Sequence, residues 1–233
     1  MLRGSTKQRM IEQTLSRRLA AEFIGTAMLL AAVVGSGIMA ERLAGGNTAV
    51  ALLANTIATG AALVALILMF APVSGAHFNP IVSAAMALSR EMSWTDALIF
   101  TAIQIAGALV GVAIANMMFE LPMFFASEKI RTGPAQWLGE FVASFGLIGV
   151  IIAVSRQYKT SAVAAAVAAY ITAAYWFTSS TSFANPAVTI ARSLSNTFAG
   201  IRPVDAPGFI AAELLGGAAA FIVFNWLVRR NHD

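Results

Sequence analysis

Hydrophobic residues occur in this chain in long, continuous runs separated by short polar stretches. Three intervals, 43–89, 97–119 and 160–191, contain no charged residue. Each is longer than the roughly 20 residues that a helix needs to cross the hydrocarbon core of a bilayer. The runs do not alternate with period two, as the strands of a membrane barrel would. The pattern predicts six membrane-spanning helices, over about 19–40, 48–71, 94–119, 136–155, 160–180 and 207–228.

Two further apolar stretches, roughly 79–89 and 185–196, are too short to span a membrane. Each begins with Asn-Pro and follows a Gly/Ser/Thr-rich bend. Asn is a preferred N-cap and Pro suits the first helical position, so each stretch reads as a helix start. Irregular backbone at membrane depth is tolerated only where it is buried in protein or lines a water-filled cavity. We therefore expect two re-entrant half-helices beside a pore or binding site.

The chain also repeats itself in order. Separations of 118, 106 and 109 residues relate three pairs of landmarks, Glu22 with Glu140, Asn79 with Asn185, and Gln104 with Glu213. Because each half holds three spanning helices, the second half enters the membrane from the opposite face. The halves, about 19–119 and 136–228, should be related by a pseudo-twofold axis in the membrane plane. We expect an all-α membrane protein with a tail of residues 1–18 and a single transmembrane domain over 19–233.

Composition and charge agree with a lipid environment. The chain is 58% hydrophobic and 11% charged with a mean hydropathy of +0.76, which leaves too little polar surface for a soluble globule. Ten of the fifteen Lys and Arg residues flank predicted spans on one side: Arg3, Lys7, Arg9, Arg17, Arg18, Arg90, Arg156, Lys159, Arg229 and Arg230. This placement predicts cytoplasmic termini. The net charge of +4 is spread over membrane flanks and gives no reason to expect a nucleic-acid partner.

Four segments together resemble the aquaporins, the major intrinsic protein family of water and small-solute channels. They read "AEFIGT", "SGAHFNP", "QIAGALVG" and "FANPAVTIA" and span nearly the whole chain. The resemblance implies a homotetramer with one pore per subunit in the plasma membrane, here a bacterial inner membrane. It implies passive conduction of small neutral solutes, with no catalytic residue, metal or cofactor. The likeness is greatest to bacterial aquaglyceroporins of the arsenic-associated type.

By that resemblance, the centre of the pore holds two three-residue motifs: Asn79, Pro80 and Ile81, and Asn185, Pro186 and Ala187. Two facing helix N-termini place partial positive charge there, which repels cations and protons. The Asn side chains can offer N–H groups to a passing hydroxyl. The alternative is that both side chains are used entirely in capping and that backbone groups contact the solute.

The outer constriction departs from the family pattern. Most relatives carry Arg directly after the second motif, where this chain has Val188. Counting back from the two Asn residues assigns the other constriction positions to Thr59, Ala173 and Ser182, all small. A wider and less polar opening follows. The alternative is that a nearby aromatic residue, Tyr175, Trp176 or Phe177, fills the space.

Three pore-side residues have two interpretations each. Arg192 follows Val188 by one helical turn and either lines the outer vestibule or binds backbone carbonyls or lipid headgroups at the half-helix end. His77 either gates the pore with pH or makes a fixed hydrogen bond. Ile81 either narrows the pore or packs against a neighbouring helix.

Acidic residues within predicted spans require an explanation, because charge is costly in lipid. Glu22 and Glu140 match a family pair that accepts hydrogen bonds from the half-helix loops. Glu213 stands where its repeat partner is Gln104, so it either has an unidentified partner or is protonated.

These features predict a passive channel for glycerol, water and neutral metalloid hydroxides such as arsenite, and for methylated arsenicals. The alternatives are a strict water channel and a proton-coupled transporter with inverted repeats, which the buried acids would serve. A membrane enzyme is disfavoured, because the chain has no Cys and only two His.

Overall fold

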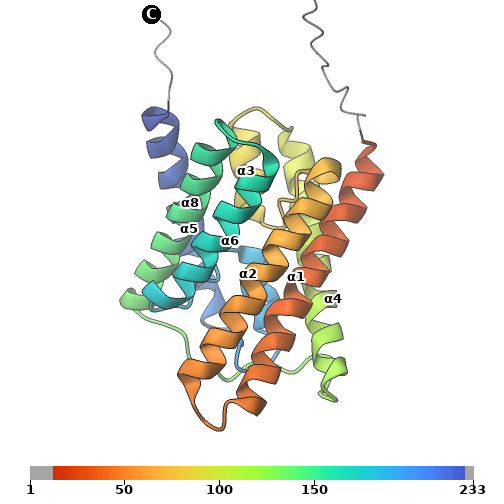
Figure 1. The fold of residues 1–233 in the computed structure, drawn as a ribbon, viewed down its shortest axis with the longest axis vertical. Helices are drawn as coiled ribbons and strands as arrows, with labels where there is room; N and C mark the ends of the chain where they lie inside the picture. The colour runs from red at the N-terminus through yellow and green to blue at the C-terminus, as the bar shows by residue number, and fades with distance from the viewer. Residues whose placement is uncertain (1–12, 229–233) are drawn as a thin grey trace, which may run out of the picture.

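The computed structural model describes residues 13–228, and these residues form a helical bundle (Figure 1). The helices are α1 Leu15–Leu43, α2 Thr48–Ser74, α3 Pro80–Leu88, α4 Trp94–Met118, α5 Pro134–Ser155, α6 Thr160–Phe177, α7 Pro186–Arg192 and α8 Ala206–Leu227. Six of them are long and apolar enough to cross a membrane. The two that are not, α3 and α7, start at the two Asn-Pro motifs. The predicted fold class is confirmed.

Some boundaries differ from the prediction. Helix α1 begins at Leu15, so the predicted tail of residues 1–18 overlaps its first turn. Helix α7 ends at Arg192 rather than near 196, because the chain turns back into the loop 193–205. The predicted flanking residues Arg3, Lys7, Arg9, Arg229 and Arg230, and also His232, lie outside the described residues.

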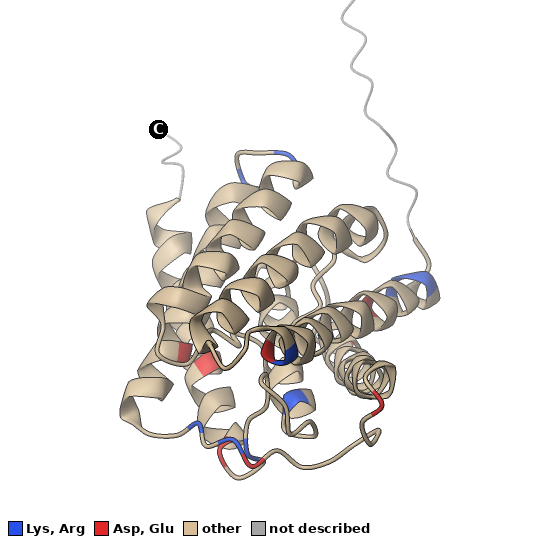
Figure 2. Cartoon of the chain, turned by 60° about the horizontal axis from the view of Figure 1, so that its bottom comes forward, with Lys and Arg blue, Asp and Glu red and all other residues tan. Residues whose placement is uncertain are grey.

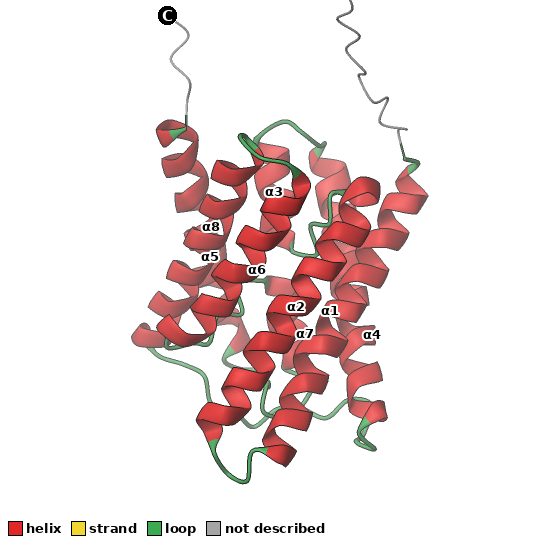
Figure 3. Ribbon diagram, in the orientation of Figure 1, coloured by secondary structure: helices red, strands yellow, loops and turns green. Residues whose placement is uncertain are grey.

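The two halves pack in the same way. Helix α1 packs against α2 and α4, α5 packs against α6 and α8, and contacts between α2 and α6 join the halves. Helices α3 and α7 lie within this frame, approached by irregular loops that run into the interior (Figure 3). The first turn of α1 and the last turn of α8 lie at one end of the bundle, which we call the terminal end (Figure 1).

Two glycines allow close helix packing at repeat-related positions. A Cβ at Gly107 would lie 2.5 Å from the carbonyl oxygen of Phe23, and one at Gly216 would collide with that of Phe141. Helices α1 and α4 therefore meet through the same contact as α5 and α8. Small residues that let backbones approach are typical of helix association in lipid.

The end opposite the termini is covered by the loop that follows α4. Backbone hydrogen bonds join Phe125 N to Leu194 O at 3.0 Å, Ser127 N to Ser193 O at 2.9 Å, and Arg202 N to Lys129 O at 2.9 Å. In Figure 2 most Lys and Arg residues lie in loops and at helix ends, while the helices are largely uncharged. The charged side chains at this end therefore surround the loops that cover α7.

We expect Gly107→Ala to lower the free energy of unfolding by about 1–3 kcal/mol, because the added methyl group would force two backbones apart. Thermal unfolding in detergent would measure the loss. Gly35→Ala in α1 is the matched control, since its Cβ would make only ordinary contacts, with Phe119 Cε2 at 3.5 Å and Met118 Cε at 4.0 Å. Equal stability of the two variants would contradict the tight contact.

Candidate functional site

Two re-entrant loops of nearly identical backbone shape form the centre of the bundle. Ala76 and Phe78 have φ of 53° and 51°, and Ser182 and Ala184, 106 residues later, have φ of 51° and 50°. Residues other than Gly rarely adopt this left-handed conformation, so the loops need support from their surroundings. The shared backbone shape shows that the repeat holds at the level of single residues.

Asn79 and Asn185 each make two kinds of hydrogen bond. The Oδ1 atom of Asn79 accepts from Ile81 N at 2.9 Å, and that of Asn185 accepts from Ala187 N at 3.0 Å. Each Nδ2 crosses to the opposite loop, Asn79 to Ala184 O and Asn185 to Phe78 O, both at 2.8 Å. One hydrogen of each amide group remains for another acceptor. The side chains thus cap their own helix and also tie the two halves together.

Glu22 and Glu140 hold the loops from behind. Glu22 accepts the backbone N–H groups of His77 at 3.0 Å and Phe78 at 2.7 Å. Glu140 accepts those of Phe183 at 2.9 Å and Ala184 at 2.7 Å. Both acids are fully buried. These backbone N–H groups would otherwise be unpaired in an apolar interior. Leaving one of them unpaired would cost about 1–3 kcal/mol.

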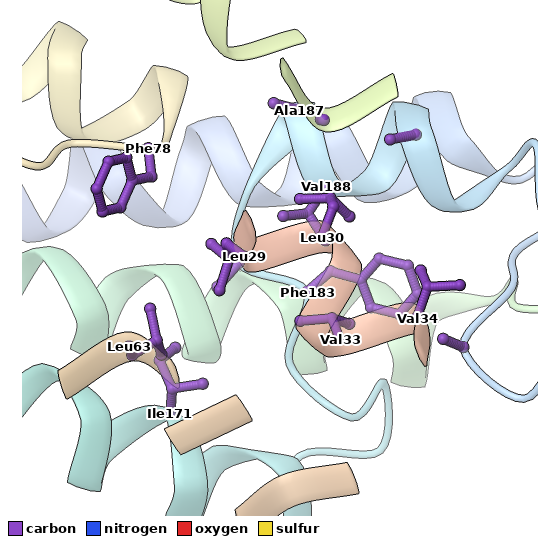
Figure 4. Close-up of a cluster of buried hydrophobic side chains, with 14 of the residues drawn as sticks. Leu29, Leu30, Val33, Val34, Leu63, Phe78, Ile171, Phe183, Ala187 and Val188 are labelled. Atoms are coloured by element: carbon purple, nitrogen blue, oxygen red, sulfur yellow. The ribbon is translucent and has the colours of Figure 1, made fainter. Parts of the chain in front are cut away.

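A cavity of about 380 Å³ runs past the two Asn residues. It extends from Glu91 and Thr160 near the terminal end to Arg192 near the opposite end. Much of its wall is apolar, and Figure 4 shows Leu63, Ile171 and Val188 among these side chains. Within the described residues, no group of His, Cys, Asp or Glu could hold a metal ion. The cavity therefore has a mostly apolar wall with a few separate hydrogen-bonding groups.

Three of the four predicted constriction residues line this cavity. Thr59, Ser182 and Val188 do so, whereas Ala173 is exposed on the other side of α6. The assignment of Ala173 is therefore corrected to Tyr175, which is buried, lines the cavity and lies with its hydroxyl 3.4 Å from Thr59 Oγ1. Tyr175 fills the space that a small residue would leave, while Trp176 and Phe177 point outward.

Arg192 lines the cavity and also binds a backbone carbonyl oxygen, two placements that the sequence left as alternatives. Its Nε donates to the carbonyl oxygen of Ala199, and its guanidinium carbon lies 3.4 Å from the ring centroid of Phe183. The side chain lines the cavity and is 2% exposed. Its Nη1, like Ser182 Oγ, has no hydrogen-bond partner among the described residues. Both polar atoms are themselves buried, so they are unpaired groups behind the surface of the cavity wall.

The remaining predicted residues lie nearer the terminal end. His77 lines the cavity, with Nδ1 3.0 Å from Ser83 Oγ. Ile81 packs in a cluster with Ile148 and Ala220 and is not part of the cavity wall, which favours packing over narrowing. Pro80, Pro186 and Ala187 are buried at the helix starts.

Sequence reasoning named Gln104 and Glu213 as repeat-related residues but missed the polar residues that they bind, Ser83 and Thr189. Gln104 donates to Glu22 Oε2 at 2.8 Å and to Ser83 Oγ at 3.0 Å, and Thr189 donates to Glu213 Oε1 at 2.6 Å. Ser83 and Thr189 are separated by 106 residues, the spacing of the Asn-Pro motifs. That spacing could have identified both.

Two further cations gather beside Phe183 and Arg192. Arg131 lies 5.1 Å from the Phe183 ring, and burial lowers its pKa to about 10. Lys129 donates to Phe198 O at 2.6 Å, and its pKa is lowered to about 8 by burial and then by the charges of Arg131 and Arg192. This end of the cavity is therefore electropositive.

Comparison with known proteins agrees with this architecture. The family model described as Major intrinsic protein matches residues 9–175. "Aquaglyceroporin AqpS" of Rhizobium meliloti (strain 1021) is 56% identical over 220 residues, covering 94% of each chain. "Aquaporin NIP6-1" of Arabidopsis thaliana is 29% identical over 147 residues, covering 63% of this chain and 47% of that protein. The structure of an aquaglyceroporin from Plasmodium falciparum shares the fold, with a TM-score of 0.72, 18% identity, and 92% and 97% coverage of this chain and that one.

The lowered pKa of Lys129 predicts a pH effect on stability. Between pH about 8 and its ordinary pKa of 10.5, the unfolded chain binds more protons than the folded one, so the free energy of unfolding rises with pH. Below pH 8 the cost of the buried ammonium is present in full. Thermal unfolding of wild type and Lys129→Met across this range would isolate the rise. A wild-type rise that persists in Lys129→Met would contradict the assignment.

Proposed function

Because this chain belongs to the major intrinsic protein family, we propose that it is a passive transmembrane channel for glycerol, water and other small uncharged solutes. The carrying observation is the cavity that passes both Asn residues, each with an amide hydrogen left over after capping and cross-linking. A solute hydroxyl accepts these hydrogens in place of those of water.

Electrostatics favours neutral solutes. The N-termini of α3 and α7 point toward the same region, and each carries partial positive charge. The acids nearest to the loops are turned away from the cavity and are occupied by backbone N–H groups. A cation beside the two Asn residues therefore meets repulsion, and Glu91, the acid in the cavity wall, lies away from them near the terminal end.

The chemistry of the constriction supports solutes with both polar and apolar surface, since Tyr175 fills the space that small residues were expected to leave. Val188 adds an apolar side chain beside the polar side chains of Tyr175, Ser182 and Arg192. Glycerol and neutral metalloid hydroxides such as arsenite share this mixture of hydroxyl and apolar surface, and methylated arsenicals add methyl groups. The relative from Rhizobium meliloti, named an aquaglyceroporin, supports the glycerol part of this proposal.

The assembly and location follow from the family. We place the protein in the bacterial inner membrane as a homotetramer with one pore per subunit. Both termini then face the cytoplasm, and Arg192 faces outward. The sequence supports this orientation, since ten of the fifteen Lys and Arg residues flank the spans on the side of the termini.

We expect Val188→Arg to reduce glycerol permeability at least about tenfold and water permeability less than about twofold, because the added cation narrows the opening for the larger solute. Stopped-flow swelling and shrinkage of proteoliposomes would measure both. Val188→Met adds bulk without charge and is the matched control. Equal losses for water and glycerol would contradict the solute class.

We expect Arg192→Gln to raise the leak of sodium ions and to lower glycerol permeability about threefold, because the variant loses the cation and weakens a hydrogen bond to solute. Arg192→Lys keeps the charge and should restore the exclusion of sodium. Ion flux and glycerol swelling in the same vesicles would test the pair. If Arg192→Gln changes neither, Arg192 has only a structural role.

A further inference from the structure

Glu213 in α8 is a fully buried acid, and only one of its two carboxyl oxygens has a hydrogen-bond partner among the described residues. Its Oε1 accepts the hydroxyl of Thr189 in α7 at 2.6 Å. Its Oε2 has no hydrogen-bond partner within residues 13–228. Its principal charged neighbour is another acid, Glu140 in α5. Both carboxyl groups are 0% exposed.

The repeat-related position in the first half of the chain indicates the role of Glu213. There Gln104 occupies the repeat-related place, and its Nε2 donates to Glu22 at 2.8 Å and to Ser83 at 3.0 Å. Glu22, Gln104 and Ser83 correspond to Glu140, Glu213 and Thr189 in the second half. The amide group of Gln104 supplies a hydrogen to the acid that holds the loop. An ionised Glu213 has no hydrogen to supply.

Two ionised carboxylates at this depth would be costly. Like charges near each other in an apolar interior disfavour ionisation, and neither residue is exposed. The charged groups that act on the pair are Arg192 in α7, which interacts with both acids, and Arg131, which interacts with Glu140. Helix α3, which also packs on α8, has no charged residue. The arginines are themselves bonded to carbonyl oxygens of the covering loops.

We propose that Glu213 carries a proton on Oε2 at neutral pH and donates it to Glu140, so that it positions the second re-entrant loop as Gln104 positions the first. The proton gives the unpartnered oxygen a hydrogen-bond partner and removes one of the two negative charges. Thr189 continues to donate to Oε1, which becomes the carbonyl oxygen of the acid. Glu213 then supplies a hydrogen to Glu140 as Gln104 does to Glu22, although Thr189 donates to Glu213 whereas Ser83 accepts from Gln104.

This proton acts on the cavity through the loop. Glu140 holds the N–H groups of Phe183 and Ala184, and Ala184 O accepts the cross-link from Asn79. Thr189 lies one turn after Asn185 in α7 and donates its N–H to Asn185 O. Glu213 is not part of the cavity wall, so it is a positioning residue.

Infrared spectroscopy of the reconstituted protein tests the proton directly. Wild type at neutral pH should show the carbonyl stretching band of a protonated carboxylic acid, with a shift on hydrogen–deuterium exchange. Glu213→Gln should lack this band. Gln104→Glu, which gives the first half the chemistry of the second, should gain one. Absence of the band from wild type, or its persistence in Glu213→Gln, overturns the proposal.

Permeability tests the positioning role, and this arm rests on the proposed channel function. Glu213→Gln keeps a donor for Glu140 and should conduct glycerol within about twofold of wild type. Glu213→Leu removes the donor and should conduct about fivefold less per folded protein. Loss of permeability in Glu213→Gln would overturn the positioning role. The infrared result does not depend on the solute, so failure of the channel function would leave it unaffected.

Discussion

Two helix N-termini in the middle of an apolar bundle are the constraint on which the rest of this structure depends. A helix start leaves backbone N–H groups unpaired, and lipid supplies no partner for them. Here the loops before α3 and α7 are held by Glu22 and Glu140, and each loop is cross-linked to the other by an Asn amide group. The shape of each loop therefore depends on hydrogen bonds with residues of both halves. The backbone of the cavity is fixed before any solute enters.

Most of the fold could be predicted from the sequence because membrane solvation is a strong and local constraint. Charge-free intervals gave the six spans, and Asn-Pro gave the two half-helices, with errors of a few residues at the ends of α1 and α7. The spans and half-helices needed only properties that act over one helix or one turn. That Glu22 and Glu140 accept hydrogen bonds from the loops was expected from the resemblance to the aquaporins, and the structure has these hydrogen bonds.

The residues of the constriction were harder to predict, because a count back from Asn185 crosses the irregular loop between α6 and α7. The loop does not keep helical phase, so the count reached Ala173 on the exposed side instead of Tyr175. The wall of α6 is formed by Val163, Val167, Ile171 and Tyr175, four residues apart in each step. That helical spacing would have identified Tyr175 without crossing the loop. The contact of Arg192 with Phe183 and Ala199 depends on how the covering loops fold, which no local pattern encodes.

The two halves share a backbone shape but differ in charge, and this difference supports the proposal that the second half contributes most to selectivity. The first loop is held by Glu22, to which Gln104 donates, and His77 lines the cavity beside it. The second loop is supported by the pair Glu140 and Glu213, and Arg131 and Arg192 stack on the ring of Phe183 within it. Val188 is apolar, and the positive charge of α7 lies one turn farther along, at Arg192. A solute at this end meets an apolar wall first and a hydrogen-bonding cation beside it, a combination suited to small molecules with both hydroxyl and apolar faces.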